Sequence, residues 1–160
     1  MVAGPGPDEV LAELGADLAR RVIAAVPAWV ARCVESRLPP AVPRRDQVMA
    51  GAAAAGGRAQ QEVAATLPAL LAADVDAQRS TPLAVVRRAV SYPTEVLRAA
   101  GVPPVPRDPF VSERFPDDPY GLTPASLAAM DPELGEPAIA WGAAKAMAHR
   151  RRHGGPSEFT

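Results

Sequence analysis

Apolar residues recur at spacings of three and four along most of this chain, which is the period of an amphipathic helix. The pattern predicts long helices over about residues 8–38 and 44–73, and a further helical stretch from Thr81 that ends at Gly101. We see no sustained alternation of apolar and polar residues and no Asn-Gly or Asp-Gly turn, so no strand is expected. The two long stripes are Val10, Leu14, Leu18, Val22, Val26, Trp29 and Cys33, then Val48, Ala52, Ala55, Ala59, Val63, Leu67 and Leu70.

Prolines set the expected ends and interruptions of these helices, because proline fixes φ and has no amide hydrogen. Pro27, Pro68 and Pro93 fall inside apolar patterns, where we expect a kink or a break. Three pairs have the residues of a helix N-cap and first position: Thr81-Pro82, Thr123-Pro124 and Asp131-Pro132. We therefore expect a short helix ending near residue 130, and a last one running to about residue 152. The apolar positions of that last helix are Leu134, Ile139, Trp141, Ala144 and Met147.

The stretch from residue 101 to residue 124 departs from the helical pattern. It holds seven of the nineteen prolines and three of the seven aromatic side chains, namely Phe110, Phe115 and Tyr120. So many prolines allow neither a long helix nor a central strand, and large rings are rare in flexible linkers. We expect residues 101–122, hereafter the 101–122 segment, to lie as a strap across the helices with its three rings inserted between them.

Together these features predict an all-α fold. We expect a kinked helical bundle of three to four main helices, with the Pro/aromatic-rich 101–122 segment packed across it. Residues 8–153 are long enough to form one helical domain with its own core, and residues 1–7 and 154–160 are expected to be flexible tails. Ala and Val are frequent and aromatic residues few, which favours close approach between helices.

Charge and cysteine content narrow the possible functions. The net charge of −1 gives no global field for nucleic acid or an anionic membrane. Cys33 is the single cysteine, so no intramolecular disulfide or multi-cysteine zinc site is expected. The N-terminal residues lack the pattern of a signal peptide. The longest uncharged apolar stretch, residues 48–57, has about half of the ~20 residues that span a membrane. We expect a cytoplasmic protein without a membrane partner.

Candidate chemical groups are sparse. Neighbouring carboxylates on an extended chain point in opposite directions. For Asp117 and Asp118 we therefore expect one to cap a turn at an adjacent proline, and the other to pair with Arg107 or Arg114. The sequence contains no calcium-loop spacing.

The remaining reactive side chains also favour structural roles. Cys33 lies on an apolar stripe, where cysteine is typically an inert small hydrophobe. Lys145 is expected at the surface, with its methylene chain covering its neighbours. His149 and His153 are four residues apart on the last helix, but zinc needs further ligands that the sequence does not offer. We therefore predict no catalytic residue, no metal and no cofactor.

A short basic run, residues 149–153, could contact phosphates. Residues 101–136 carry seven acidic residues against two arginines, a net of −5, and the helix that follows carries +4. We expect these opposite charges to pair within the chain.

Three hypotheses for the function follow, in this order. The first is a non-catalytic protein-interaction module, able to self-associate into a homo-oligomer, that uses the Ala/Gly face of residues 49–59 and the 101–122 segment. The second is a small-ligand-binding protein or enzyme with a pocket beneath that segment. The third is weak nucleic-acid binding through Arg150–Arg152, joined by Arg44, Arg45, Arg87 and Arg88. The candidate partner or ligand contacts are Arg107, Asp108, Phe110, Arg114, Phe115, Asp117, Asp118 and Tyr120.

Overall fold

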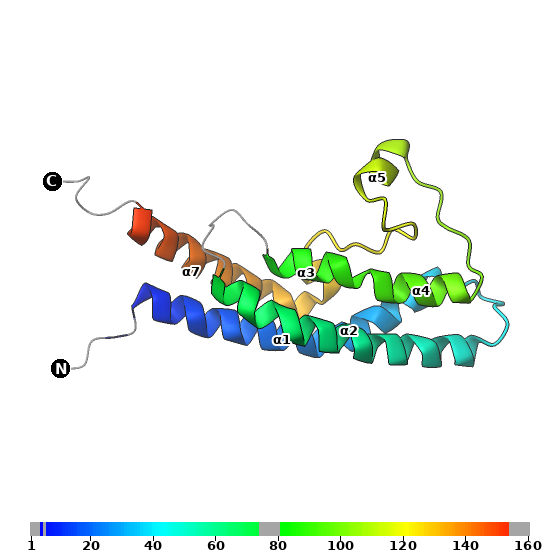
Figure 1. The fold of residues 1–160 in the computed structure, drawn as a ribbon, viewed down its shortest axis with the longest axis horizontal. Coiled ribbons are helices and arrows are strands. Elements are labelled where there is room, and N and C mark those ends of the chain that lie inside the picture. The colour runs from blue at the N-terminus through cyan, green and yellow to red at the C-terminus, as the bar shows by residue number, and fades with distance from the viewer. Residues whose placement is uncertain (1–3, 5, 74–80, 154–160) are drawn as a thin grey trace.

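The computed structural model describes residue 4 and residues 6–73 and 81–153. These ranges are mostly helical and contain no strand, which confirms the all-α prediction. The predicted tails, residues 1–7 and 154–160, fall largely outside the described residues. The elements are α1 (Pro7–Arg37), α2 (Arg45–Ala73), α3 (Thr81–Ala89), α4 (Ser91–Ala99), α5 (Pro109–Arg114), α6 (Leu127–Met130), the 3₁₀ helix η1 (Pro132–Leu134) and α7 (Gly135–His153) (Figure 1).

The two longest helices, α1 and α2, pack along each other and form the centre of the molecule (Figure 1). Helices α3 and α4 lie against α2, and α4 also contacts α1. Helix α7 runs antiparallel to the N-terminal half of α1. At one end of this pair the Arg152 guanidinium lies 2.8 Å from the Asp8 carboxylate, and between the ends Trp141 packs against Gly15. None of the described helices is long and apolar enough to cross a membrane.

The core is built mainly from small and aliphatic side chains of α1 and α2. Every predicted position from Leu18 to Cys33 on α1 and from Ala52 to Leu67 on α2 is buried. The α2 stripe ends one residue later than predicted, since Leu71 is buried whereas the predicted Leu70 is partly exposed. A step of four residues from Leu67 follows the helical period better than a step of three at this point. Ten of the predicted stripe positions therefore lie in the core.

Helix α1 continues through Pro27 because α2 supplies what the proline lacks. Pro27 has no N–H to donate to the carbonyl of Ile23, four residues earlier. The Gln60 side-chain amide donates to that carbonyl instead, at 3.0 Å. Gly56 lets the backbones approach, since a Cβ there would lie 3.0 Å from the Pro27 Cα. The proline is thus accommodated by two α2 residues.

The other predicted interruptions have different outcomes. Helix α2 also continues through Pro68. The third helical stretch is divided at Val90, three residues before Pro93, so that Pro93 lies in the first turn of α4, where a missing N–H costs little. Pro93 thus lies at the start of a helix, whereas Pro27 and Pro68 lie inside continuous helices.

The predicted helix ends are largely confirmed. Gly101 has φ +76° and follows α4 as its C′ residue, with the amides of Gly101 and Val102 donating to the carbonyls of Arg98 and Leu97. Asp131 caps η1 by accepting from the Glu133 amide at 3.0 Å, as the Asp-Pro pair predicts. The Thr123-Pro124 pair does not start a helix. Helix α6 begins after Ser126, whose hydroxyl accepts from the amide of Ala129 at 3.1 Å.

Helix α7 does not bury all of its predicted apolar positions. Trp141 and the η1 residue Leu134 are buried, but Ile139 and Met147 are exposed. Since successive residues of a helix are about 100° apart, Ile139 and Met147 lie on the side opposite the one that faces α1. The expectation that these two apolar residues face the core was therefore wrong.

Candidate functional site

The 101–122 segment turns back on itself, so that its two ends lie together. The Tyr120 hydroxyl donates to the Val102 carbonyl at 2.6 Å, and the Val105 amide donates to the Pro119 carbonyl at 3.2 Å. Tyr120 is almost completely buried, as predicted for a ring that inserts into the core. These contacts close the base of a loop whose outer part carries α5.

Asp118 holds the returning arm of this loop. Its side chain is buried, and its carboxylate accepts from the Leu122 amide and the Thr123 amide at 2.8 Å each, and from the Thr123 hydroxyl at 2.7 Å. This confirms that one member of the acidic pair caps a turn. The predicted ion pair of the other member with Arg107 or Arg114 does not form among the described residues, and the Arg107 guanidinium instead donates to the main-chain carbonyl of Asp118. Asp117 is exposed and forms no ion pair with another described residue.

Arginines of α1 anchor the same region to the central helices. Arg37 Nε donates to the Tyr120 carbonyl at 2.8 Å, and Arg32 Nη2 donates to the Met130 carbonyl at 2.7 Å. Both are hydrogen bonds from a charged donor, which are stronger than neutral ones. The base of the loop is therefore fixed to the C-terminal half of α1.

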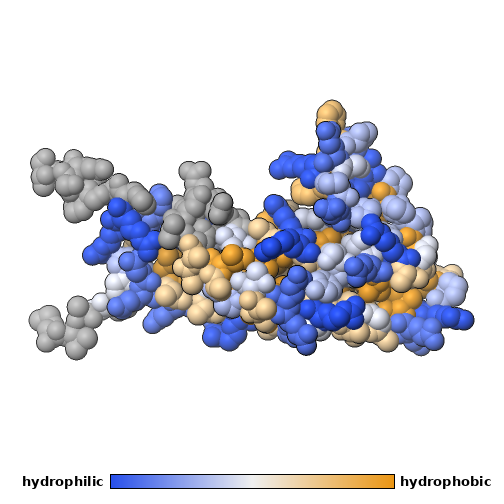
Figure 2. Space-filling model, in the orientation of Figure 1, coloured by the Kyte–Doolittle hydropathy of each residue, from blue (hydrophilic) through white to orange (hydrophobic). Residues whose placement is uncertain are grey.

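The outer part of the loop is a short helix that projects from the molecule (Figure 1). Asp108 caps α5 by accepting from the Phe110 amide at 2.8 Å, and Pro109 occupies the first helical position. Phe110 is 81% exposed, and Val111 beside it is also exposed. Figure 2 shows an apolar residue at the outermost end of this protrusion. Hereafter the α5 tip means Phe110 and Val111.

The prediction that all three rings insert between helices is therefore wrong for Phe110. Phe115 is half-buried, with the Arg114 guanidinium 5.6 Å from its ring centre, and Tyr120 is buried. The reason lies within the loop, whose polar groups form hydrogen bonds between its own two arms. Arg107, for example, bonds the returning arm rather than a long helix, which leaves the tip free of the core.

A cleft of about 520 Å³ lies between the returning arm of the loop and helices α3 and α4. Four arginines line it: Arg87 and Arg88 from α3, Arg98 from α4 and Arg114 from α5. None of the four forms an ion pair with a described carboxylate. The acidic residues on its wall are Glu95, Asp117 and Asp118, the last of which is occupied by its hydrogen bonds. Of the predicted contacts, Arg114, Phe115, Asp117 and Asp118 line the cleft, whereas Arg107 and Asp108 do not.

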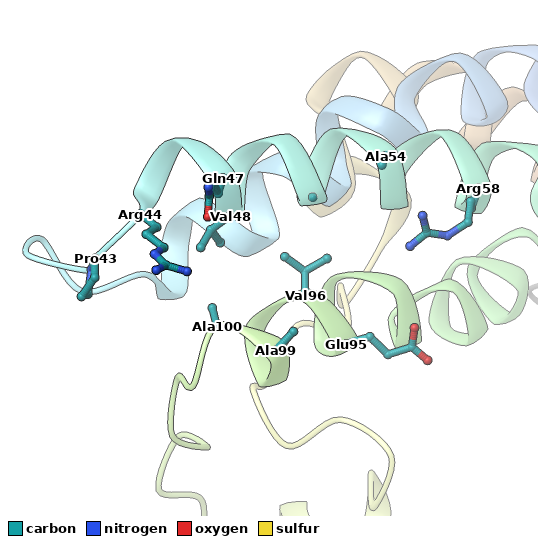
Figure 3. Close-up of a pocket in the computed structure, with 11 residues that line it drawn as sticks. Pro43, Arg44, Gln47, Val48, Ala54, Arg58, Glu95, Val96, Ala99 and Ala100 are labelled. Atoms are coloured by element: carbon teal, nitrogen blue, oxygen red, sulfur yellow. The ribbon is translucent and has the colours of Figure 1, made fainter.

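A second, open groove of about 580 Å³ runs between α2 and α4 (Figure 3). Its floor is made of small and aliphatic side chains, among them Val48, Ala54 and Val96, and Arg58 and Glu95 project at one end (Figure 3). The predicted Ala/Gly face of residues 49–59 is thus divided. Ala52, Ala55, Gly56 and Ala59 are buried, with Gly56 against Pro27 of α1, whereas Gly51, Ala54 and Arg58 line the groove.

The candidate nucleophiles are placed in the core. Burial raises the pKa of the Cys33 thiol from 9.0 to about 12, so the thiol stays protonated at neutral pH and is inert, as predicted. Lys145 is buried, which corrects the expectation of a surface lysine. Its ammonium lies 4.7 Å from the centre of the Trp141 ring, one helical turn away, so the ring replaces part of its hydration.

The remaining ionisable clusters do not form a common site. No three His, Cys, Asp or Glu side chains lie close enough to hold a metal within the described part of the chain, and the side chain of His153 is outside that part. The basic end of α7 forms an ion pair with α1, between Arg152 and Asp8, a partner that lies outside the predicted residues 101–136. Of the arginines considered for nucleic acid, Arg44 lines the α2/α4 groove, and Arg87 and Arg88 line the cleft.

The sequence-based predictions missed two features of the structure. The cleft arginines of α3 and α4 meet Arg114 only because the loop folds back, which no local pattern predicts. The outward position of Ile139 and Met147 could have been found, because both are out of phase with Trp141 in a 3.6-residue period. No protein-family model matches the chain, and the comparisons with curated proteins and with solved structures found no match. The residues and contacts of this chain therefore carry the argument for its function.

Proposed function

We propose that this protein is a non-catalytic protein-interaction module that binds a partner through the α5 tip. In this proposal the long helices act as a bundle-like scaffold and the 101–122 segment as a strap that presents the tip. The observation that carries the proposal is the 81% exposure of Phe110 at the end of a loop whose base is fixed by hydrogen bonds.

The energetics favour a partner at this position. Burying a phenylalanine side chain that was exposed stabilises a complex by about 1.5–3 kcal/mol. The loop is already ordered by its own hydrogen bonds and by the Asp108 cap, so less conformational entropy is lost on binding. Arg114 follows four residues after Phe110, and aromatic and arginine side chains are the types that dominate interface hot spots.

The test is photo-crosslinking in the cells that produce the protein. A benzophenone amino acid replaces Phe110 in one variant and the exposed Ala65 of α2 in a control. We expect a discrete crosslinked product from position 110 that position 65 does not give, with the partner identified by mass spectrometry. Equal labelling at the two positions, or none at position 110, would contradict the proposal.

A second candidate function is supported by the cleft. Four arginines without described carboxylate partners favour an anionic small ligand with phosphate or carboxylate groups, because a guanidinium binds such groups through two parallel hydrogen bonds. The wall of the cleft combines polar and apolar side chains, which favours binding. Among its described residues there is no nucleophile–base pair of the kind that catalysis needs.

Calorimetry with inorganic pyrophosphate as the probe tests this second candidate. We expect saturable binding that weakens at least tenfold in Arg114→Gln, and no change in Arg20→Gln, where the exposed arginine instead pairs with Asp17 on α1. An unchanged affinity in Arg114→Gln, or no binding by the wild type, would remove the candidate.

A further inference from the structure

Helix α7 carries a stripe of exposed residues along the side that faces away from the molecule. With residues about 100° apart, five of them fall within about 40° of the direction of Ala143. These five, hereafter the α7 stripe, are Glu136, Ile139, Ala143, Met147 and Arg150, and all are exposed.

The stripe is the reverse of the side by which α7 is held. Trp141, Lys145 and Ala148 are buried and lie on the opposite face of the helix, toward α1. Ile139 is 73% exposed and Met147 is 54% exposed. They are two of the five large apolar side chains that remain exposed in the described ranges, and they lie on one helix face eight residues apart. A lysine is thus buried while an isoleucine and a methionine face outward. This is the reverse of the usual amphipathic arrangement, in which apolar side chains face the core and charged side chains face solvent.

The order of residues in the stripe is symmetric about Ala143. Glu136 and Arg150 are each seven residues from it, and Ile139 and Met147 are each four residues from it. If a second α7 lies antiparallel with its Ala143 at the same crossing point, Ile139 of one copy meets Met147 of the other. The same register places Glu136 opposite Arg150 of the second copy, and the two-fold axis repeats each contact.

We propose that the α7 stripe binds the α7 stripe of a second copy of this chain in an antiparallel, two-fold symmetric pair. The charge complementarity selects this occupant and this direction. A parallel pair would place Glu136 against its own equivalent and Arg150 against its own, which is repulsive. The antiparallel pair also opposes the helix dipoles, and the small Ala143 at the crossing lets the axes approach to roughly 8 Å, the short end of the usual range.

The dimer is expected to be reversible. Residues 136 and 150 are about 21 Å apart along the helix, at 1.5 Å for each residue. One helix pair of this length buries less than the ~800 Å² per partner of a typical stable complex. This inference goes beyond the proposed function. It concerns a surface separate from the α5 tip, so the two can fail independently.

Sedimentation equilibrium of the full chain over a wide concentration range tests the pairing. We expect a monomer–dimer equilibrium for the wild type. Glu136→Arg alone and Arg150→Glu alone should each weaken dimerisation about tenfold, because symmetry turns two attractive contacts into two repulsive ones. The double variant Glu136→Arg/Arg150→Glu restores both contacts and the wild-type net charge, and should dimerise within about threefold of the wild type.

Two controls accompany these variants. Glu13→Arg makes the same change in charge at an exposed position of α1 and should leave the equilibrium unchanged. Phe110→Ser should also leave it unchanged, since the α5 tip is not part of this contact. A wild type that stays monomeric at all concentrations overturns the inference. A charge-swapped double variant that dimerises no better than the single variants overturns it as well.

Discussion

The buried carboxylate of Asp118 offers the sharpest test of what fixes the 101–122 segment. The perturbation is Asp118→Asn, which keeps the size of the side chain and removes its charge. The carboxylate accepts three hydrogen bonds of 2.7–2.8 Å, two of them from main-chain amides. An asparagine can offer one oxygen to these donors, and its NH₂ group faces another donor. The Leu122 amide or the Thr123 groups then lose their acceptor.

The expected cost follows from the environment. A hydrogen bond to a charged group contributes about 1.5–3 kcal/mol, and an unsatisfied buried donor costs about 1–3 kcal/mol. The Asp118 side chain is buried, and Thr123 is half-buried and can regain water. We therefore expect Asp118→Asn to lower the free energy of unfolding by about 2–4 kcal/mol. The neighbouring Asp117→Asn makes the same chemical change at an exposed residue and should stay within about 0.5 kcal/mol.

Urea denaturation followed by far-ultraviolet circular dichroism measures both free energies. Trypsin provides a local readout, since Arg107 and Arg114 flank α5. Cleavage after these residues should be faster in Asp118→Asn than in the wild type, and unchanged in Asp117→Asn. If both variants lose the same stability, or if Asp118→Asn is neutral, the carboxylate does not fix the segment and the reasoning is refuted.

The remaining predictions concern the central helices. Gly56→Ala should lower the free energy of unfolding by about 1–2 kcal/mol, because the added Cβ meets Pro27. Gly57→Ala should raise it by up to about 1 kcal/mol, because nothing lies within 4 Å of the added Cβ. Urea denaturation that gives the reverse order would contradict this packing. In the wild-type background, Gln60→Ala should lower the free energy of unfolding by about 1–2 kcal/mol. In the Pro27→Ala background the same substitution should lower it much less, and a double-mutant cycle measures the difference. The raised pKa of Cys33 means that its protonated form contributes stability in full below pH 9.0, and that this contribution is lost as the pH rises toward about 12. Cys33→Ala should lack this alkaline loss, and an equal loss in both proteins would exclude the thiol as its cause.

The sequence predicted the helices well because their signals are local. The spacing of apolar residues located α1 and α2, and Gly101 and Asp131 marked ends whose hydrogen bonds involve residues close in the chain. The continuity of α1 through Pro27 could not be predicted, since it depends on Gln60, thirty-three residues later, reaching a carbonyl that the proline leaves free.

The candidate site was predicted in part for the same reason. A turn cap by one carboxylate of the Asp117-Asp118 pair follows from the neighbouring prolines, and the buried Tyr120 follows from the general preference of rings for the interior. The exposure of Phe110 depends on how the two arms of the loop bond to each other across about fifteen residues. The burial of Lys145 depends on the docking of α7 against α1, which neighbouring residues do not reveal.

The most direct test of the central claim combines two measurements on Phe110→Ser. The first is its free energy of unfolding, and the second is its binding to the partner captured by crosslinking at position 110. If the tip serves a contact and not the protein's own core, stability should stay within about 0.5 kcal/mol of the wild type while binding is lost. Binding that persists, or a loss of stability near the 3–5 kcal/mol of a truncated core phenylalanine, would contradict the account.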